Sequence, residues 1–166
     1  MILAFDVFYN GNIAQAVGVG FEFWSDQIPK VVYKELVIGI EEYEPGEFYK
    51  RELPCIERLL NKINLKSVTC IIVDGYVYLD DSGKPGLGAH LYHRCESLIP
   101  VIGVAKTPYY NNTKNVKLVH RGESTKPLYV SAIGMDAEEA ARNIQNMHGE
   151  FRIPTILRKL DTLSRR

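Results

Sequence analysis

The stretch Met1-Ile-Leu-Ala-Phe-Asp-Val-Phe-Tyr9, followed by Asn10-Gly11, specifies the first structural unit of the chain. Its apolar and aromatic residues predict a strand over residues 1–9, and Asn-Gly predicts a tight turn. A second strand is expected over residues 13–23. After a break that ends at Pro29, a third is expected over residues 31–40. Three strands joined by short connections indicate an antiparallel meander.

A second pattern follows the meander and predicts helices that alternate with buried strands. From Glu52 on, apolar residues recur at helical spacing over three turns, with Pro54 in the first turn of the expected helix. The apolar runs 68–73 and 101–105 predict buried strands, separated by a glycine-rich loop and a helix that ends at Ser97. A strand, a helix and another strand in this order imply a parallel crossover.

The rest of the chain predicts one more hairpin and two helices. Segments 116–120 and 127–131 suit the hairpin, and helices are expected over residues 136–147 and 154–163. Three antiparallel strands followed by a helix and parallel strands is the element order of a ribonuclease H-like α/β fold. We therefore expect one domain over residues 1–166, with a mixed sheet and flanking helices.

Composition and charge limit the classes of protein. The 166 residues have a formal net charge of +0 and a pI of about 6.9, so no overall basic field argues for nonspecific nucleic-acid binding. Any contact with DNA or RNA must rest on local groups, and two basic clusters are candidates: Lys114, Lys117, His120 and Arg121, and Arg152, Arg158, Lys159, Arg165 and Arg166. Such clusters more often form solvated faces.

Cysteine spacing and hydropathy bear on compartment. Cys55, Cys70 and Cys95 have no CxxC spacing and are expected to be reduced, buried thiols. No signal peptide precedes the first strand, and no apolar run approaches the roughly 18 residues of a membrane span. We expect a cytoplasmic monomer that does not associate with membranes.

Two aspartates stand in or directly after apolar runs. In a strand, Asp6 shares a face with Ile2, Ala4 and Phe8, and a metal or a catalytic partner is one reason to leave a carboxylate there. Asp74 follows the run 68–73, at the strand edge where ligands gather in folds with parallel strands. Carboxylates that converge from separate elements can bind Mg²⁺, although aspartates at strand ends also serve as turn formers.

Five short motifs follow one another along the chain. They are Tyr43-Glu-Pro-Gly46, Arg51-Glu52-Leu-Pro54, Val73-Asp74-Gly75, Gly86-Leu-Gly-Ala-His90 and Ile102-Gly-Val-Ala-Lys106. In order and approximate spacing they resemble endonuclease V, as does the tail from Tyr129-Val-Ser131 to Arg152-Ile-Pro154. The resemblance covers most of the chain.

This resemblance implies a ribonuclease H-like nuclease of nucleic-acid repair. Such an enzyme would use Mg²⁺, or Mn²⁺ in its place, to cut the second phosphodiester bond on the 3′ side of deoxyinosine in DNA or inosine in RNA. The family's metal-binding catalytic acids match Asp6, Glu52 and Asp74. Its catalytic lysine matches Lys106, whose charge would neutralise the scissile phosphate. Without the resemblance, Glu52 would suit the first turn of a helix for electrostatic reasons alone.

The same resemblance implies a set of substrate-binding residues. Tyr43 matches the tyrosine of the family's strand-separating wedge, where an aromatic ring offsets the loss of base stacking. Glu42 and Glu44 beside it depart from the family's Pro-Tyr-Ile-Pro-Gly pattern and should repel phosphates. The rest of the expected set is Gly46, Gly75, Gly86 and His90.

Two departures from the family pattern leave alternatives open. The segment 131–136 lacks the histidine of the family's Ser-Pro-Gly-His, and the segment 76–81 replaces one that ends in His-Pro-Arg. Asp136 is a candidate for an additional metal ligand, although its spacing from Glu139 favours a helix cap. The alternatives are a nucleic-acid-binding module of the same fold that has lost efficient catalysis, and a related metal nuclease with another substrate.

Overall fold

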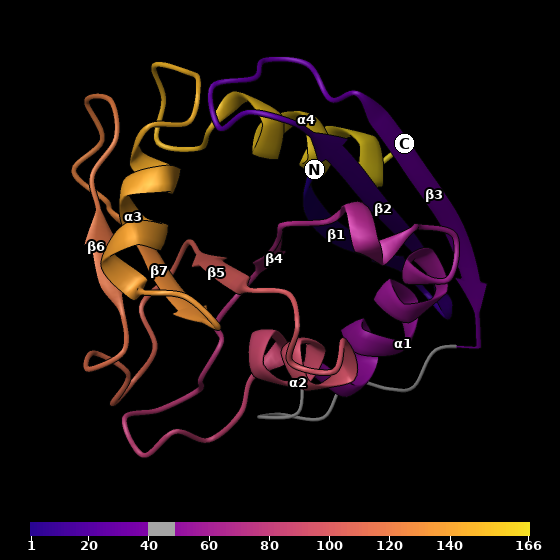
Figure 1. Cartoon of the computed structure of the whole chain (residues 1–166), viewed down its shortest axis with the longest axis horizontal. Coiled ribbons are helices and arrows are strands. Elements are labelled where there is room, and N and C mark those ends of the chain that lie inside the picture. The colour runs from indigo at the N-terminus through magenta and orange to yellow at the C-terminus, as the bar shows by residue number, and fades with distance from the viewer. Residues whose placement is uncertain (40–48) are drawn as a thin grey trace.

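The computed structural model describes residues 1–39 and 49–166. Its strands are β1 (Ile2–Asn10), β2 (Ile13–Phe21), β3 (Val31–Ile38), β4 (Cys70–Asp74), β5 (Val101–Ala105), β6 (Lys117–Val119) and β7 (Leu128–Ile133). Its α-helices are α1 (Tyr49–Leu60), α2 (Leu87–Arg94), α3 (Ala137–Gln145) and α4 (Thr155–Ser164). The strands form one mixed sheet in the order β3-β2-β1-β4-β5-β7-β6 (Figure 1).

The first three strands form the predicted antiparallel meander. Gly11 supplies the positive φ of 64° that the turn between β1 and β2 requires, and Asp6 lies opposite Val17. β2 and β3 both end about two residues before the predicted limits. The meander therefore places Asp6 in the body of a paired strand.

β4 and β5 run parallel to β1, as the predicted crossover requires. The last pairs in the two parallel ladders are Phe5 with Val73 and Asp74 with Val104. Asp6 is thus level with Asp74 at the carboxyl edge of the sheet. The predicted ribonuclease H-like mixed sheet is confirmed.

The last two strands extend the sheet in the opposite direction. β7 runs antiparallel to β5, so that Ile133 at the end of β7 pairs with Val101 at the start of β5. The hairpin of β6 and β7 was predicted, but its attachment to β5 was not. Residues that follow β7 consequently lie at the edge opposite Asp74.

The helices cover both faces of the sheet. α1 and α2 pack on the face that carries Leu3 and Phe5, and α3 and α4 pack on the face that carries Ile2 and Ala4. α1 begins three residues before the predicted start, so Pro54 lies inside it. α2 ends before Ser97 because Glu96 and Ser97 adopt positive φ angles of 59° and 57°, which a helix does not tolerate.

Two expectations about the chemistry of the chain can be compared with the structure. The three cysteines are free and buried, as expected. In residues 1–39 and 49–166, no helix has the length and apolarity needed to cross a membrane.

Candidate active site

Three predicted acids come from three different elements and are close enough for their charges to interact. Asp6 lies in β1, Asp74 ends β4, and Glu52 lies in the first turn of α1. Glu52 is only 6% exposed, whereas the Asp74 side chain is 54% exposed. The fold therefore brings together residues that lie up to 68 positions apart in the sequence, counting from Asp6 to Asp74.

Burial and repulsion between acids raise the pKa values of these carboxyls. Burial, with a further contribution from the charge of Asp6, raises the pKa of Glu52 to about 8, and the neighbouring Tyr9 partly opposes the shift. Burial also raises the pKa of Asp6 to about 6, with repulsion from Asp74 adding to the effect. Desolvation by the surrounding protein raises the pKa of the Asp74 carboxyl, and the positive charge of Lys106 lowers it. Such shifts are typical of functional sites.

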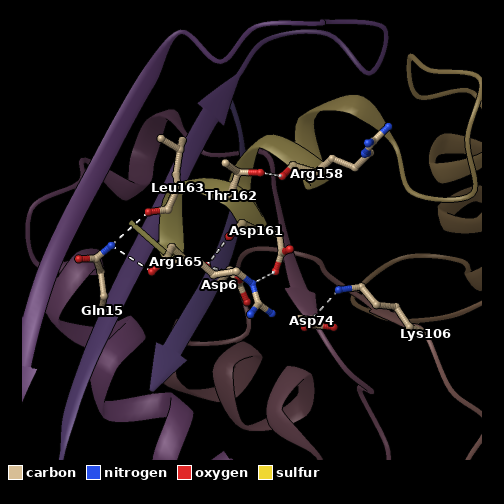
Figure 2. A network of polar contacts seen from close by, with 10 residues as sticks. Asp6, Gln15, Asp74, Lys106, Arg158, Asp161, Thr162, Leu163 and Arg165 are labelled. Atoms are coloured by element: carbon tan, nitrogen blue, oxygen red, sulfur yellow. Dashed lines mark hydrogen bonds and ion pairs between the residues drawn. The ribbon is translucent and has the colours of Figure 1, made fainter. Parts of the chain in front are cut away.

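The final helix adds a fourth acid that the sequence analysis missed. Figure 2 shows Asp161 of α4, and Arg165 directly after this helix, facing Asp6 of β1. The Arg165 Nε atom donates to Asp161 Oδ1 at 3.2 Å, and the charge of Asp161 contributes to the raised pKa values of Asp6 and Asp74. We call Asp6, Glu52, Asp74 and Asp161 the acid cluster.

The position of α4 depends on hydrogen bonds to the meander. The Ser164 hydroxyl donates to Asp6 Oδ2 at 2.7 Å. The Gln15 side-chain amide of β2 donates to the carbonyls of Leu163 at 3.1 Å and Ser164 at 3.0 Å (Figure 2). These contacts hold the last turn of α4 against Asp6 and satisfy carbonyl groups that a helix end leaves unpaired.

Lys106 stands at the carboxyl edge beside the acid cluster. Its Nζ atom lies 3.9 Å from Asp74 Oδ2, and its side chain is 44% exposed (Figure 2). The Lys106 carbonyl accepts a hydrogen bond from the Arg152 guanidinium, which also donates to the Pro127 carbonyl at 2.7 Å. The lysine thus has an anchored backbone and a side chain that can reach a substrate.

A neighbouring buried arginine fixes the loop that carries Arg152. Arg121 is only 3% exposed, and its guanidinium donates to the carbonyls of Met147 at 2.6 Å and Phe151 at 2.8 Å. Arg121 was a candidate for a local basic surface in the sequence analysis. The structure instead gives it an internal role.

The acid cluster suits a hard cation by the chemistry of its donors. Carboxylate oxygens are the preferred ligands of Mg²⁺ and Mn²⁺. Burial and, to a smaller extent, repulsion between the acids raise the pKa values of Asp6 and Glu52, and a divalent cation would offset that repulsion. In residues 1–39 and 49–166, no three acid, histidine or cysteine side chains stand close enough to form a preassembled metal cage.

Asp136 does not belong to this cluster. It follows β7 at the opposite edge of the sheet, and its side chain accepts a hydrogen bond from the Glu139 backbone at 3.4 Å as the cap of α3. The helix-cap interpretation is confirmed. The antiparallel attachment of β7 is the reason that Asp136 is remote from the other acids.

A cavity of about 310 Å³ adjoins Asp74 and Lys106. Gly75 lines it with a φ of 122°, which disfavours any other residue. Gly86 also lines it, and a Cβ atom there would meet the Tyr76 carbonyl at 2.7 Å. Both predicted glycines thus border the cavity, whose aromatic lining residues are Tyr49, Tyr76 and Tyr109.

The other predicted substrate-binding residues have different positions. His90 stacks on the Tyr49 ring with a centroid distance of 3.7 Å, and Tyr49, not His90, lines the cavity. Burial lowers the pKa of His90. Tyr43 and Gly46 lie outside the described residues.

Comparison with known proteins identifies the family. A sequence model described as Endonuclease V matches residues 1–162. The chain belongs to the endonuclease V family. Members of this family are nucleases, so the chain is a hydrolase that acts on phosphodiester bonds.

Solved endonuclease V structures share this fold. Endonuclease V from Ciona intestinalis, in complex with a DNA that contains an inosine followed by a ribo-adenosine, has a TM-score of 0.83 and 20% identity, covering 99% of this chain and 83% of that chain. Human ENDOV has a TM-score of 0.77 and 22% identity, covering 99% of this chain and 82% of that chain. Endonuclease V from Streptomyces avermitilis has a TM-score of 0.75 and 22% identity, covering 99% of this chain and 79% of that chain. No curated protein sequence matches the chain.

Two departures from the endonuclease V pattern, in segments 131–136 and 76–81, lie away from the acid cluster or form an anchored loop, whereas Glu42 and Glu44 lie outside the described residues. Gly134 and Met135, where the family histidine was expected, follow β7 at the opposite edge, so the difference removes no side chain from the cluster. In the segment 76–81, the Tyr78 carbonyl accepts from Asn112 at 2.7 Å and Asp81 accepts from the Lys114 backbone at 2.7 Å. Neither departure alters the acids themselves.

Proposed function

We propose that the acid cluster cuts inosine-containing nucleic acid at the second phosphodiester bond on the 3′ side of deoxyinosine in DNA or inosine in RNA, as an enzyme of nucleic-acid repair. The single observation that supports this most is that Asp6, Asp74 and Asp161 line one cavity together with Lys106. Glu52 is near enough for the charges of Asp6 and Asp74 to raise its pKa. Family membership and the inosine-containing DNA bound by the Ciona protein support the substrate.

The roles of the residues follow from their chemistry. Mg²⁺, or Mn²⁺ in its place, held by carboxylates of the acid cluster would supply water activation and charge neutralisation at the phosphate. Ser164 orients Asp6 by donating to its Oδ2 atom at 2.7 Å. Lys106 lies near enough to Asp74 to neutralise the negative charge that develops on a phosphate bound there.

The cavity beside Asp74 suits a base that has left its stack. Its aromatic walls offer stacking surfaces, and its glycine-lined rim permits close approach of the base to the backbone. The Tyr76 hydroxyl donates to the Thr107 carbonyl at 2.6 Å, which holds that ring in place. We assign inosine recognition to Gly75, Gly86 and the tyrosines of this cavity, with Tyr43 and Gly46 as further candidates.

A cleavage assay tests the proposal. End-labelled single strands of DNA and RNA, each with and without one inosine, are incubated in Mg²⁺ and in chelator. We expect a Mg²⁺-dependent cut one nucleotide beyond the 3′ bond of inosine. Asp74→Asn and Asp161→Asn should lower kcat by about 100-fold or more, because each removes a charge from the cation site.

Glu138→Gln is the matched control, since Glu138 is a 65% exposed acid on α3 and pairs only with Lys117 among the interactions described. Full activity of both aspartate variants would contradict the role of the acid cluster. Inosine-specific binding by a folded wild-type protein that makes no cut would instead support the binding-module alternative.

A further inference from the structure

One face of the meander continues beyond the end of α4, and no helix or strand of residues 1–39 and 49–166 covers it there. α4 packs over Ile2 and Ala4 on β1 and over Val17 and Val19 on β2, and it ends at Ser164 beside Asp6. In Figure 1 the carboxyl end of α4 lies near β2 and β3.

Apolar side chains occupy the part of this face that α4 leaves open. Residues directly opposite in a sheet share a face, and the pairs Phe8–Gln15, Gln15–Leu36 and Ile13–Ile38 place all of them on the α4 side. The exposed fractions are 41% for Ile13, 62% for Leu36 and 73% for Ile38. We call Phe8, Ile13, Leu36 and Ile38 the shelf.

Positive charge borders the shelf. A cavity of about 180 Å³ is lined by Phe8, Ile13 and Leu36 together with Arg165 and Arg166. The Arg165 guanidinium carbon lies 5.0 Å from the centroid of the Phe8 ring. Among the described residues that line this cavity, two carry a positive charge and none carries a negative one.

The shelf is continuous with the acid cluster. Phe8 follows Asp6 by two residues on the same face of β1, and Arg165 contacts both Asp161 and the Phe8 ring. A strand with a phosphate at the acid cluster can therefore extend past Arg165 onto the shelf.

We propose that the shelf binds a flanking nucleotide of the single-stranded substrate, with its base on Phe8 and Leu36 and its phosphate on Arg165 and Arg166. This inference rests on the proposed nuclease function. Aromatic and apolar surfaces bordered by arginine bind bases with little sequence preference, because every base has an apolar face. A second copy fits less well, since a symmetric contact through the shelf would bring the arginines of both copies together.

Binding measurements with shortened strands test this proposal. Labelled inosine-containing single strands are shortened stepwise on the 5′ or the 3′ side, and Kd is measured by fluorescence anisotropy in chelator. In the wild-type protein, loss of the nucleotide that occupies the shelf should weaken binding about tenfold. Phe8→Ala and Leu36→Ser should bind the long strand about tenfold more weakly and lose the sensitivity to shortening on that side.

Leu118→Ala is the matched control, because Leu118 is a 58% exposed apolar residue on β6 at the other end of the sheet. Cleavage kinetics in Mg²⁺ should show a rise in KM that exceeds any fall in kcat for the shelf variants. Leu36→Ser removes an exposed side chain, so it keeps the test valid if Phe8→Ala fails to fold.

The outcomes separate this inference from the proposed function. The shelf proposal would be overturned, and the proposed function kept, by the following result. The wild-type protein cleaves its substrate, and Kd depends on strand length equally in the wild type, Leu36→Ser and Leu118→Ala. Absence of cleavage by the wild type would overturn the proposed function, while the anisotropy series would still decide whether the shelf binds a strand. A concentration-dependent dimer that Leu36→Ser disrupts, with unchanged strand affinity, would assign the shelf to a second copy and also overturn the proposal.

Discussion

At the scale of single residues, Glu52 shows how the fold makes an acid hold its proton. The residue lies in the first turn of α1, where a carboxylate alone would be favoured by the helix dipole. Burial and the charge of Asp6 outweigh this and raise the pKa of Glu52 from 4.5 to about 8. The folded protein therefore binds this proton more tightly than the unfolded chain does.

This difference predicts the pH dependence of stability in chelator. Below pH 4.5 Glu52 is protonated in both states, and between pH 4.5 and about 8 the unfolded chain loses its proton first. The free energy of unfolding should thus fall as pH rises through this range, by at most about 5 kcal/mol from Glu52. Urea unfolding between pH 5 and 8.5 measures it.

Glu52→Gln should flatten that profile and make the protein more stable than the wild type near pH 8. The exposed Glu123→Gln is the control and should follow the wild-type profile. Asp6, whose pKa is raised to about 6, leaves a smaller slope below pH 6 in the Glu52→Gln variant. Parallel profiles for the wild type and Glu52→Gln would show that Glu52 is not the source.

At the scale of elements, the placement of α4 determines whether the fourth acid reaches the others. The helix buries Ile156 and Leu160 against the sheet, which fixes its axis, and its last turn is held by the two hydrogen bonds from Gln15. Asp161 and Ser164 lie one turn apart on the side that meets Asp6. The position of Asp161 therefore depends on a contact between α4 and β2.

Gln15→Ala should loosen the last turn of α4. We expect a loss of about 1 to 2 kcal/mol in the free energy of unfolding, because two carbonyls lose their donors. We also expect a fall in kcat of about tenfold or more, because Asp161 and Ser164 lose their fixed position. Hydrogen exchange of residues 162–166 should become faster than in the control Gln145→Ala, an exposed glutamine of α3. Unchanged exchange would remove Gln15 from this role.

At the scale of the whole molecule, the acid cluster places carboxyl groups from both ends of the chain close enough to repel one another. β1, α1, β4 and α4 each contribute one carboxyl, so a cation bound there would link four elements that otherwise repel one another at this edge. A ligand that binds only the folded state stabilises it by mass action.

Mg²⁺ should therefore raise the stability of the whole protein. At 10 mM and a Kd of about 0.1 to 1 mM, the gain is about 1.4 to 2.7 kcal/mol, or about 3 to 10 °C in Tm. Thermal unfolding at pH 7.5 with and without Mg²⁺ measures this gain. Asp74→Asn should lose most of it and Glu138→Gln should keep it, whereas an equal gain in both variants would place the cation elsewhere.

Several features were predictable from sequence because local patterns specify them. The run from Met1 to Tyr9 and the turn at Asn10-Gly11 predict the meander, and the apolar runs before Asp74 and Lys106 predict the parallel strands. Since parallel strands share one carboxyl edge, the proximity of Asp6, Asp74 and Lys106 follows from the order of the elements. The resemblance to endonuclease V added Glu52, whose helix position alone has an ordinary explanation.

The remaining features depend on contacts between distant parts of the chain. Asp161 and Ser164 look like ordinary polar residues of a terminal helix, and only the packing of α4 on β1 and β2 brings Ser164 to Asp6, 158 positions away. The sequence alone determined the antiparallel meander, the parallel strands and the edge at which two acids meet, because hydrophobic periodicity and turn residues act locally. The tertiary structure alone decided that α4 completes the acid cluster and that β7 carries Asp136 away, because both depend on how whole elements pack.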